Sequence, residues 1–151
     1  MPAVTAGLAK AGRAREHFEI AGGGFLCTGE DDATVQKMFE WVRQRVAFYG
    51  STQAYWPVLS VHGLDDLGRK LNAVTREGNW AAMAKEVPDD VVHLFAAVGR
   101  HDQVAGIIEK RFGGLVDSLF ASASSSVPGD LPPDLIQDIR RIPVAFKRFA
   151  T

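Results

Sequence analysis

The chain has 151 residues, 46% hydrophobic and 23% charged, a composition that predicts one soluble globular unit with a buried core. The formal net charge of -1 excludes the basic surface that binds nucleic acid or an anionic membrane. Cys27 is the only cysteine, so an intramolecular disulfide and a paired-cysteine zinc site are excluded. The sequence has neither a signal-peptide pattern nor a run of roughly 18 apolar residues. We expect a cytoplasmic protein with neither nucleic acid nor a membrane as partner.

Two helices are predicted in the first third of the chain. Residues 2–10 carry apolar side chains at helical spacing and are followed by Gly12, which predicts a short helix. Thr28 and Asp31 form a T-x-x-D capping box, and the helix that it opens extends to Gly50. Its apolar residues recur every three or four positions, which predicts one buried stripe. The stripe consists of Val35, Met38, Phe39, Val42, Val46 and Tyr49.

A glycine run interrupts the segment between these helices. Residues 18–27, FEIAGGGFLC, predict a strand with a kink or bulge at residues 22–24. The glycines could instead cradle a phosphate, but such a cradle needs them in the turn that opens a helix. Since they interrupt an extended segment, the kinked strand is the favoured interpretation.

Glycines and prolines divide residues 51–90 into pieces that predict several short helices. Trp56 and Trp80 are expected to anchor these pieces to the main body, because large rings bury much apolar surface. His62 lies close to Asp65 and Asp66, which suggests either a metal or acid/base site, or two aspartates at a helix N-terminus. We favour the helix start, because no second histidine lies at ligand spacing, and we expect no bound metal.

The next segment predicts a strand, a helix and a strand within about 30 residues, the spacing of a parallel βαβ crossover. The strands are residues 94–98 and 115–121, and the helix has an apolar face from Val104 to Phe112. The turn between the first strand and the helix reads VGRHDQ and lacks G-x-G-x-x-G, which argues against dinucleotide binding of the Rossmann type.

The C-terminal region begins with SASSSVPG, residues 122–129, a composition typical of a linker. A helix is predicted behind Pro132 and Pro133, with Pro143 ending it. Its apolar face consists of Leu135, Ile136, Ile139 and Ile142. The basic residues of the tail, Lys147 and Arg148, are expected to be solvated.

No single motif identifies a chemistry, but the order of several segments resembles a known family. These segments are FEIAGGGFLCTGEDDATV, QRVAFYGSTQAYWPVL, VHGLDDLGRKLNAVTREGNWAAM and FAAVGRHDQVAGIIEKRFGGLVDSL. Together they resemble the C-terminal part of luciferase-like oxidoreductases, above all those that use the deazaflavin coenzyme F420. FYGST, HGLDDL and the VG turn before DQV carry most of the resemblance, which extends over residues 1–120.

The resemblance implies an α/β fold built from the last β/α units of a TIM (β/α)8 barrel. A complete barrel takes about 250 residues, so a helix-rich, incomplete barrel is expected here. Residues 1–121 would form this part, with a helical insertion at about 51–90, and residues 122–151 would add a linker and a helix. Residues 18–27 and 115–121 would be barrel strands, and residues 94–98 a connector strand.

The resemblance also implies a function. Complete relatives transfer a hydride between a deazaflavin and an organic small molecule, with FMN as the alternative cofactor. Barrel sites lie at the carboxyl ends of the strands, which makes Thr28 and Ser122 the candidate cofactor-binding residues. No position matches a catalytic motif of the family.

Two other classes of function stay open, a non-catalytic remnant that self-associates and a small α/β binding module unrelated to the barrel. An incomplete barrel leaves strand edges and apolar surface uncovered. We therefore expect a homo-oligomer, or a partner chain that completes the barrel.

Overall fold

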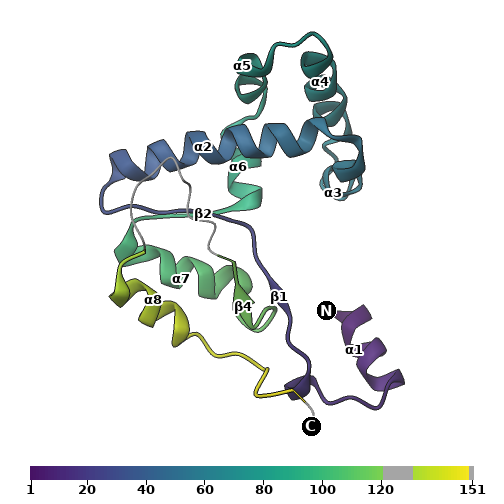
Figure 1. Ribbon diagram of the computed structural model, residues 1–151, viewed down its shortest axis with the longest axis vertical. Coiled ribbons are helices and arrows are strands. Elements are labelled where there is room, and N and C mark those ends of the chain that lie inside the picture. Colours follow the sequence, from purple (N-terminus) through teal and green to yellow (C-terminus); the bar gives the residue numbers. More distant parts are fainter. Residues whose placement is uncertain (121–130, 150–151) are drawn as a thin grey trace.

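The computed structural model describes residues 1–120 and 131–149 and has a helix-rich α/β fold. Figure 1 shows an elongated molecule, with α2 to α6 at one end and α1, α7 and α8 towards the other. The helices are α1 (Pro2–Lys10), α2 (Asp32–Ser51), α3 (Trp56–Ser60), α4 (Asp65–Arg76), α5 (Trp80–Met83), α6 (Asp89–Phe95), α7 (His101–Phe112) and α8 (Pro133–Arg140). The strands are β1 (Ala21–Gly22), β2 (Phe25–Cys27), β3 (Ala96–Val98) and β4 (Ser118–Leu119). Three short 3-10 helices are η1 (Arg15–His17), η2 (Gln53–Tyr55) and η3 (Ala84–Glu86).

The strands form two short parallel pairs. In one pair β1 lies beside β4, and in the other β2 lies beside β3 with Phe25 opposite Ala96 and Cys27 opposite Val98. The described residues therefore form two separate two-stranded sheets. The predicted helix-rich α/β class is confirmed, while barrel closure is not seen in the described part of the chain.

The glycine run divides the predicted strand of residues 18–27 into β1 and β2, as the expected kink implies. Gly23 has φ +127°, a conformation that L side chains rarely adopt. A Cβ atom added to Gly24 would lie 2.3 Å from the backbone oxygen of Phe95. Gly24 therefore lets the start of β2 approach the end of α6 more closely than any other residue could.

The predicted strand pairing in the second half of the chain is wrong. The strand at residues 94–98 was expected to be a connector in a crossover unit with residues 115–121. Instead β3 pairs with β2, and β4 pairs with β1. Helix α6 also extends to Phe95, so β3 begins only at Ala96. Residues 94–98 are all apolar, and periodicity alone cannot distinguish the last turn of a buried helix from a buried strand in such a run.

Helix α2 keeps the predicted buried stripe but begins differently. Its N-cap is Asp31, whose Oδ1 accepts from the backbone N–H of Thr34 at 2.7 Å. The predicted capping box with Thr28 as N-cap is therefore wrong, because the aspartate is itself the cap residue. Four stripe residues are buried, whereas Tyr49 is 41% exposed. The buried four are Met38, Phe39, Val42 and Val46.

Several short helices follow α2, as predicted, and only one of the two tryptophans anchors them. Trp56 donates from Nε1 to the Gly50 oxygen at 3.0 Å, and its ring lies 3.0 Å from the position of a Cβ atom on Gly68. Trp80 is 56% exposed and packs at 6.4 Å, between ring centroids, against the exposed Phe48. The anchoring role predicted for Trp80 is wrong, because its ring lies on the surface of the α2 to α5 region.

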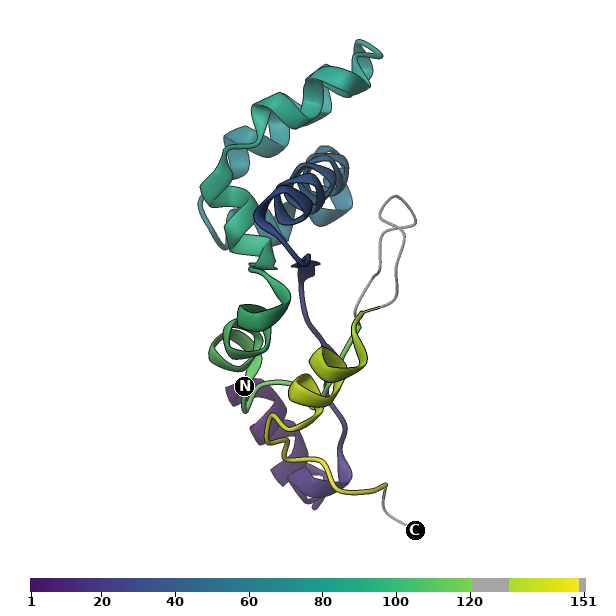
Figure 2. The same ribbon diagram turned by 90° about the vertical axis from the view of Figure 1, so that its left-hand side faces the viewer.

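Sheet β2–β3 has helices on both faces. On one face Cys27 and Ala96 join a cluster built mainly from α2, α4 and α6, which we call the α2 cluster. On the other face Ala97 packs with residues of α7 and α8, which we call the α8 cluster. Figure 2 shows α2 in the upper half and α8 in the lower half of the molecule. In a closed β/α barrel all helices cover the outer face, so this two-sided packing differs from the expected geometry.

Asp117 joins three segments that are far apart in the sequence. Its side chain is 1% exposed and pairs with Arg15 at 2.7 Å, and it accepts from the Ile20 N–H at 2.8 Å. The N–H groups of Ala145 and Phe146 donate to its other oxygen at 3.0 and 2.9 Å. One buried carboxylate therefore holds the segment before β1, the start of β4 and the C-terminal tail together.

Lys147 and Arg148 in the tail are exposed, as expected, but Lys147 also makes a specific contact. Lys147 pairs with the Glu16 carboxylate at 2.8 Å, and the N–H of Lys147 donates to the Glu16 backbone oxygen at 2.9 Å. Because the lysine side chain stays largely exposed, this contact positions the tail but adds little to the stability of the fold.

Within the described ranges, no helix combines the length and the apolar character that crossing a membrane requires.

Candidate functional site

The carboxyl ends of β2 and β3 meet at one edge of their sheet. Because the strands are parallel and Cys27 lies opposite Val98, Thr28 and Gly99 emerge side by side. Two backbone hydrogen bonds extend the pairing, from Gly99 N–H to the Cys27 oxygen at 3.0 Å and from His101 N–H to the Gly29 oxygen at 2.9 Å. These hydrogen bonds define the edge, and the carboxyl edge of parallel strands is where open and closed α/β folds bind their ligands.

Thr28, the first predicted site residue, lies at this edge with an unusual hydroxyl. The residue is 7% exposed, and its Oγ1 atom is buried without a hydrogen-bond partner among the described residues. An unsatisfied buried polar group costs about 1–3 kcal/mol, and such groups in native proteins commonly serve a ligand or a bound water. The geometry is therefore compatible with a hydroxyl that serves a ligand or a further part of the protein.

Two helix N-termini converge beside Thr28, and Arg100 links them. Its guanidinium lies 3.3 Å from Asp102 in the first turn of α7 and 3.3 Å from Asp32 in the first turn of α2. Hydrogen bonding to Asp102, and then to Asp32, raises the pKa of Arg100. Helix N-termini favour anions, but the aspartates already supply negative charge here. Sequence reasoning examined this turn only for glycines and therefore missed Arg100.

Cys27 does not provide a nucleophile at this edge. The residue is completely buried, and burial raises the pKa of its thiol to about 12. The reactive form of cysteine is the thiolate, which is scarce at neutral pH when the pKa is that high. Cys27 is a packing residue of the α2 cluster.

Ser122, the second predicted site residue, and the predicted linker at residues 122–129 lie outside the described residues.

His62, Asp65 and Asp66, which the sequence places close together, do not form a common site in the structure. His62 packs edge-on against Phe95, Asp65 accepts from the Ser60 hydroxyl at 2.5 Å, and Asp66 pairs with Arg69 at 2.7 Å. Both aspartates lie in the first turn of α4, as the helix-start interpretation predicted, although the N-cap itself is Leu64.

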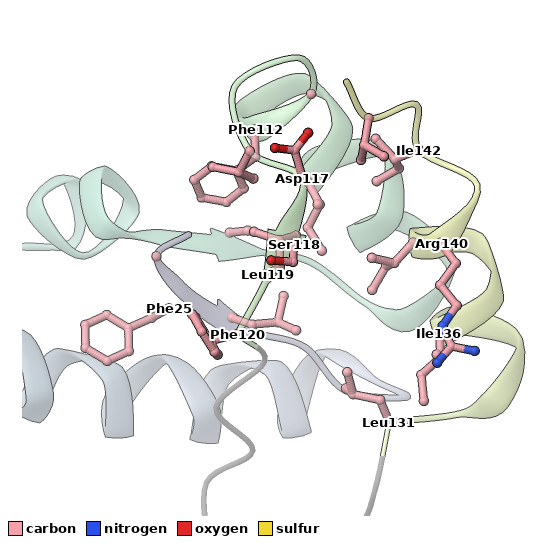
Figure 3. Close-up of a pocket in the computed structure, with 18 residues that line it drawn as sticks. Phe25, Phe112, Asp117, Ser118, Leu119, Phe120, Leu131, Ile136, Arg140 and Ile142 are labelled. Carbon is pink, nitrogen blue, oxygen red and sulfur yellow. The ribbon is translucent and has the colours of Figure 1, made fainter. Parts of the chain in front are cut away.

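Two apolar cavities lie away from the Thr28 edge. One of about 270 Å³ opens between α2 and α3 and is bordered by Tyr49, Tyr55 and Phe95. The other, of about 470 Å³, lies between β4, α7 and α8 (Figure 3). Thr28 lines neither of them. Neither of these two cavities therefore encloses the Thr28 hydroxyl.

Asp117, which borders the larger cavity, is the second residue that sequence reasoning missed. Burial by itself raises the pKa of Asp117, but hydrogen bonds from Ile20 and Phe146 and the Arg15 ion pair outweigh it and lower the pKa. In the sequence, Asp117 is the one charged residue within the mostly apolar run LVDSLF. A buried charge has to be paired, so such a residue indicates a polar contact even where its partners are unknown.

Comparison with known proteins shows the family. The family model of luciferase-like monooxygenases matches residues 1–118. Uncharacterized proteins of Mycobacterium bovis and Mycobacterium tuberculosis are 38% identical over 144 residues, which is 93% of this chain and 41% of theirs. A 5,10-methylenetetrahydromethanopterin reductase of Archaeoglobus fulgidus is 32% identical over 108 residues, 67% of this chain and 31% of its own length.

The chain thus spans about two fifths of the length of its mycobacterial relatives. The match covers α1 to the start of β4, and it includes the Thr28 edge and the helical region between α2 and β3. The resemblance seen in the sequence is confirmed, and the chain belongs to the luciferase-like monooxygenase family.

Proposed function

We propose that this chain works as the C-terminal part of an oxidoreductase that transfers a hydride between coenzyme F420 and an organic small molecule. The observation that supports this most is the similarity to the archaeal protein, whose name describes a reductase. Reducing a carbon centre requires two electrons and a proton, which a deazaflavin delivers as a hydride, while the protein orients the reactants. Residues 1–121 would form the barrel part, and residues 122–151 the linker and last helix.

The Thr28 hydroxyl is the group of this chain that fits a cofactor contact. It is buried, it lies at the carboxyl edge of parallel strands, and it has an unused donor and acceptor. In this proposal Thr28 hydrogen-bonds a polar atom of the cofactor, and Ser122 is the second contact. Arg100 holds the starts of α2 and α7 in place around Thr28. The remaining walls of the site would come from the part of the barrel that this chain does not contain.

A chimera tests this function. Residues 1–151 would be fused to the part of the Mycobacterium tuberculosis relative that the alignment leaves uncovered, and coenzyme F420 and FMN would be titrated separately. We expect saturable binding of F420 and slow reduction of the deazaflavin by a suitable donor. A chimera that folds and binds FMN in preference to F420 would instead favour the FMN-dependent alternative.

Thr28→Val in the chimera tests the predicted contact, because valine keeps the shape and removes the hydroxyl. We expect about tenfold weaker F420 binding, as the cofactor would lose one hydrogen bond in a buried site. Thr52→Val is the matched control, since Thr52 is only half-buried, at the end of α2. Equal binding by the two variants would contradict the role of Thr28.

We also propose that the isolated chain associates, as a twofold dimer or with a polypeptide that supplies the missing barrel part. Among the described residues each strand pairs along one edge only, which leaves backbone groups open to another strand. The surface of α2 and α3 adds exposed apolar side chains, including Tyr49, Tyr55 and Val58, beside the smaller cavity. Apolar patches of this kind mark interfaces on soluble proteins.

Light scattering during size-exclusion chromatography measures the association directly. We expect a mass twice that of one chain at micromolar concentration. Tyr55→Ser and Val58→Ser together would shift the chain towards monomer, whereas Arg69→Ser on the polar surface of α4 would not. A stable monomer of the unaltered chain would contradict self-association and leave the separate partner chain as the remaining form of this proposal.

A further inference from the structure

The larger cavity has the dimensions and lining of a small-molecule site. Its volume is about 470 Å³, within the range of about 300–1,000 Å³ that such sites have. Its wall is mostly apolar and comes from β2, β4, α7 and α8. Figure 3 shows Phe112, Leu119 and Ile136 around it. A ligand in this cavity would bury an apolar body against these four elements.

Two charged residues line the cavity, Asp117 and Arg140. The Asp117 carboxylate is already satisfied by Arg15 and by three backbone N–H groups. Arg140, on α8, takes part in none of the ion pairs formed among residues 1–120 and 131–149. Its neighbour Arg141 differs, because it pairs with Asp138 at 2.9 Å. Among the described residues, the wall therefore offers one guanidinium to a ligand and no free carboxylate.

We propose that this cavity binds an amphipathic carboxylate, with its hydrocarbon chain among the apolar side chains and its carboxylate on Arg140. The planar guanidinium can donate two parallel hydrogen bonds to a carboxylate, a geometry that lysine does not offer. A polyanion would find only one cation among the described residues that line the cavity. An uncharged apolar molecule would leave Arg140 unused. The site is separate from the Thr28 edge, and the proposal does not depend on hydride transfer.

Calorimetric titration of the whole chain with decanoate and with decan-1-ol tests the ligand class. The two molecules share the same chain, and only decanoate carries a charge; both are used well below the concentration at which decanoate forms micelles. We expect one saturable site for decanoate and about tenfold weaker binding of the alcohol, the difference that one charge-assisted contact makes. Equal affinities, or no saturable binding of decanoate, would overturn the proposal.

Two neighbouring arginines provide a matched pair of variants. Arg140→Gln should weaken decanoate binding about tenfold and leave decan-1-ol binding unchanged. Arg141→Gln should leave both unchanged, because Arg141 does not line the cavity. Both residues are exposed, so neither variant is expected to unfold the chain, and thermal unfolding checks this. The same loss in both variants would show that decanoate binds through general charge attraction, contrary to the proposal.

The isoleucine methyl groups locate the ligand. Four isoleucines line the cavity, while Ile20 and Ile107 do not, so the δ1-methyl spectrum of isoleucine-labelled protein contains its own control. The lining four are Ile108, Ile136, Ile139 and Ile142. Decanoate should shift their signals and leave the other two unchanged. Shifts confined to Ile20 and Ile107, or spread evenly over all signals, would place the ligand elsewhere and contradict the proposal.

Discussion

The two faces of sheet β2–β3 differ in the apolar clusters that cover them. The α2 cluster combines residues of α2, α4, α5 and α6 with β2 and β3, and several of its side chains are fully buried. The α8 cluster has few fully buried residues and borders a cavity of about 470 Å³. The Asp117 contacts, all polar, lie on this second side. One core is built around a long periodic helix, whereas the other lies beside a cavity that a buried carboxylate borders.

The largest expected effect of a single substitution lies in the α2 cluster. Phe39→Ala should lower the free energy of unfolding by about 3–5 kcal/mol, because a buried ring is lost from a well-packed site. Gln44→Ala, on the exposed side of the same helix, should change it by less than about 0.5 kcal/mol. Urea unfolding followed by circular dichroism measures both. Equal effects would mean that the buried face of α2 is wrongly assigned.

The next effect concerns Asp117. Asp117→Asn should lower the free energy of unfolding by about 3 kcal/mol, because the amide presents a donor to other donors and leaves Arg15 without its partner. Asp134→Asn, an exposed residue in the first turn of α8, is the control and should have a small effect. A loss in the control as large as in the Asp117 variant would contradict the central role of this carboxylate.

Asp117 also makes stability depend on pH. Its pKa is lowered in the folded chain, so the unfolded chain binds the proton more readily. The contribution of Asp117 is therefore fully present above the unfolded pKa of about 3.9 and is lost as the pH falls through the lower folded pKa. Unfolding measured between pH 7 and pH 2 should show a steeper acid loss in the unaltered chain than in Asp117→Asn. Parallel curves would contradict this assignment.

A smaller effect is expected in the α8 cluster. Leu135 is 2% exposed, and Leu135→Ala should cost about 2 kcal/mol, at the low end for a buried leucine. The reason is that α8 borders the cavity and can shift towards it. Thermal unfolding beside Phe39→Ala measures the difference between the clusters. A loss as large as that of Phe39→Ala would show that the α8 cluster is as tightly packed as the α2 cluster.

The sequence predicted what depends on local periodicity and punctuation. The bounds of α1, the buried stripe of α2 and the short helices after it follow from apolar spacing and from glycine and proline positions. Strand partners could not be predicted, because two- and three-residue strands carry no register information of their own. The predicted pairing of residues 94–98 with 115–121 failed for this reason.

The candidate site likewise has residues that the sequence predicted and residues that it did not. Thr28 was predicted from its place after a strand, and the structure puts it at a sheet edge with an unused hydroxyl. Arg100 and the partners of Asp117 were missed, because their contacts join residues that lie dozens of positions apart. Such contacts depend on the tertiary fold, which spacing along the chain does not encode.

Fluorescence titration of the purified 151-residue chain with coenzyme F420 tests the central claim most directly. The claim is that this chain holds one wall of a cofactor site whose other walls lie in the rest of the barrel. Binding should therefore be absent or far from saturation at micromolar cofactor, because a site of this kind needs several converging loops. Tight, stoichiometric binding by the isolated chain would contradict the claim, since it would place the whole site within these residues.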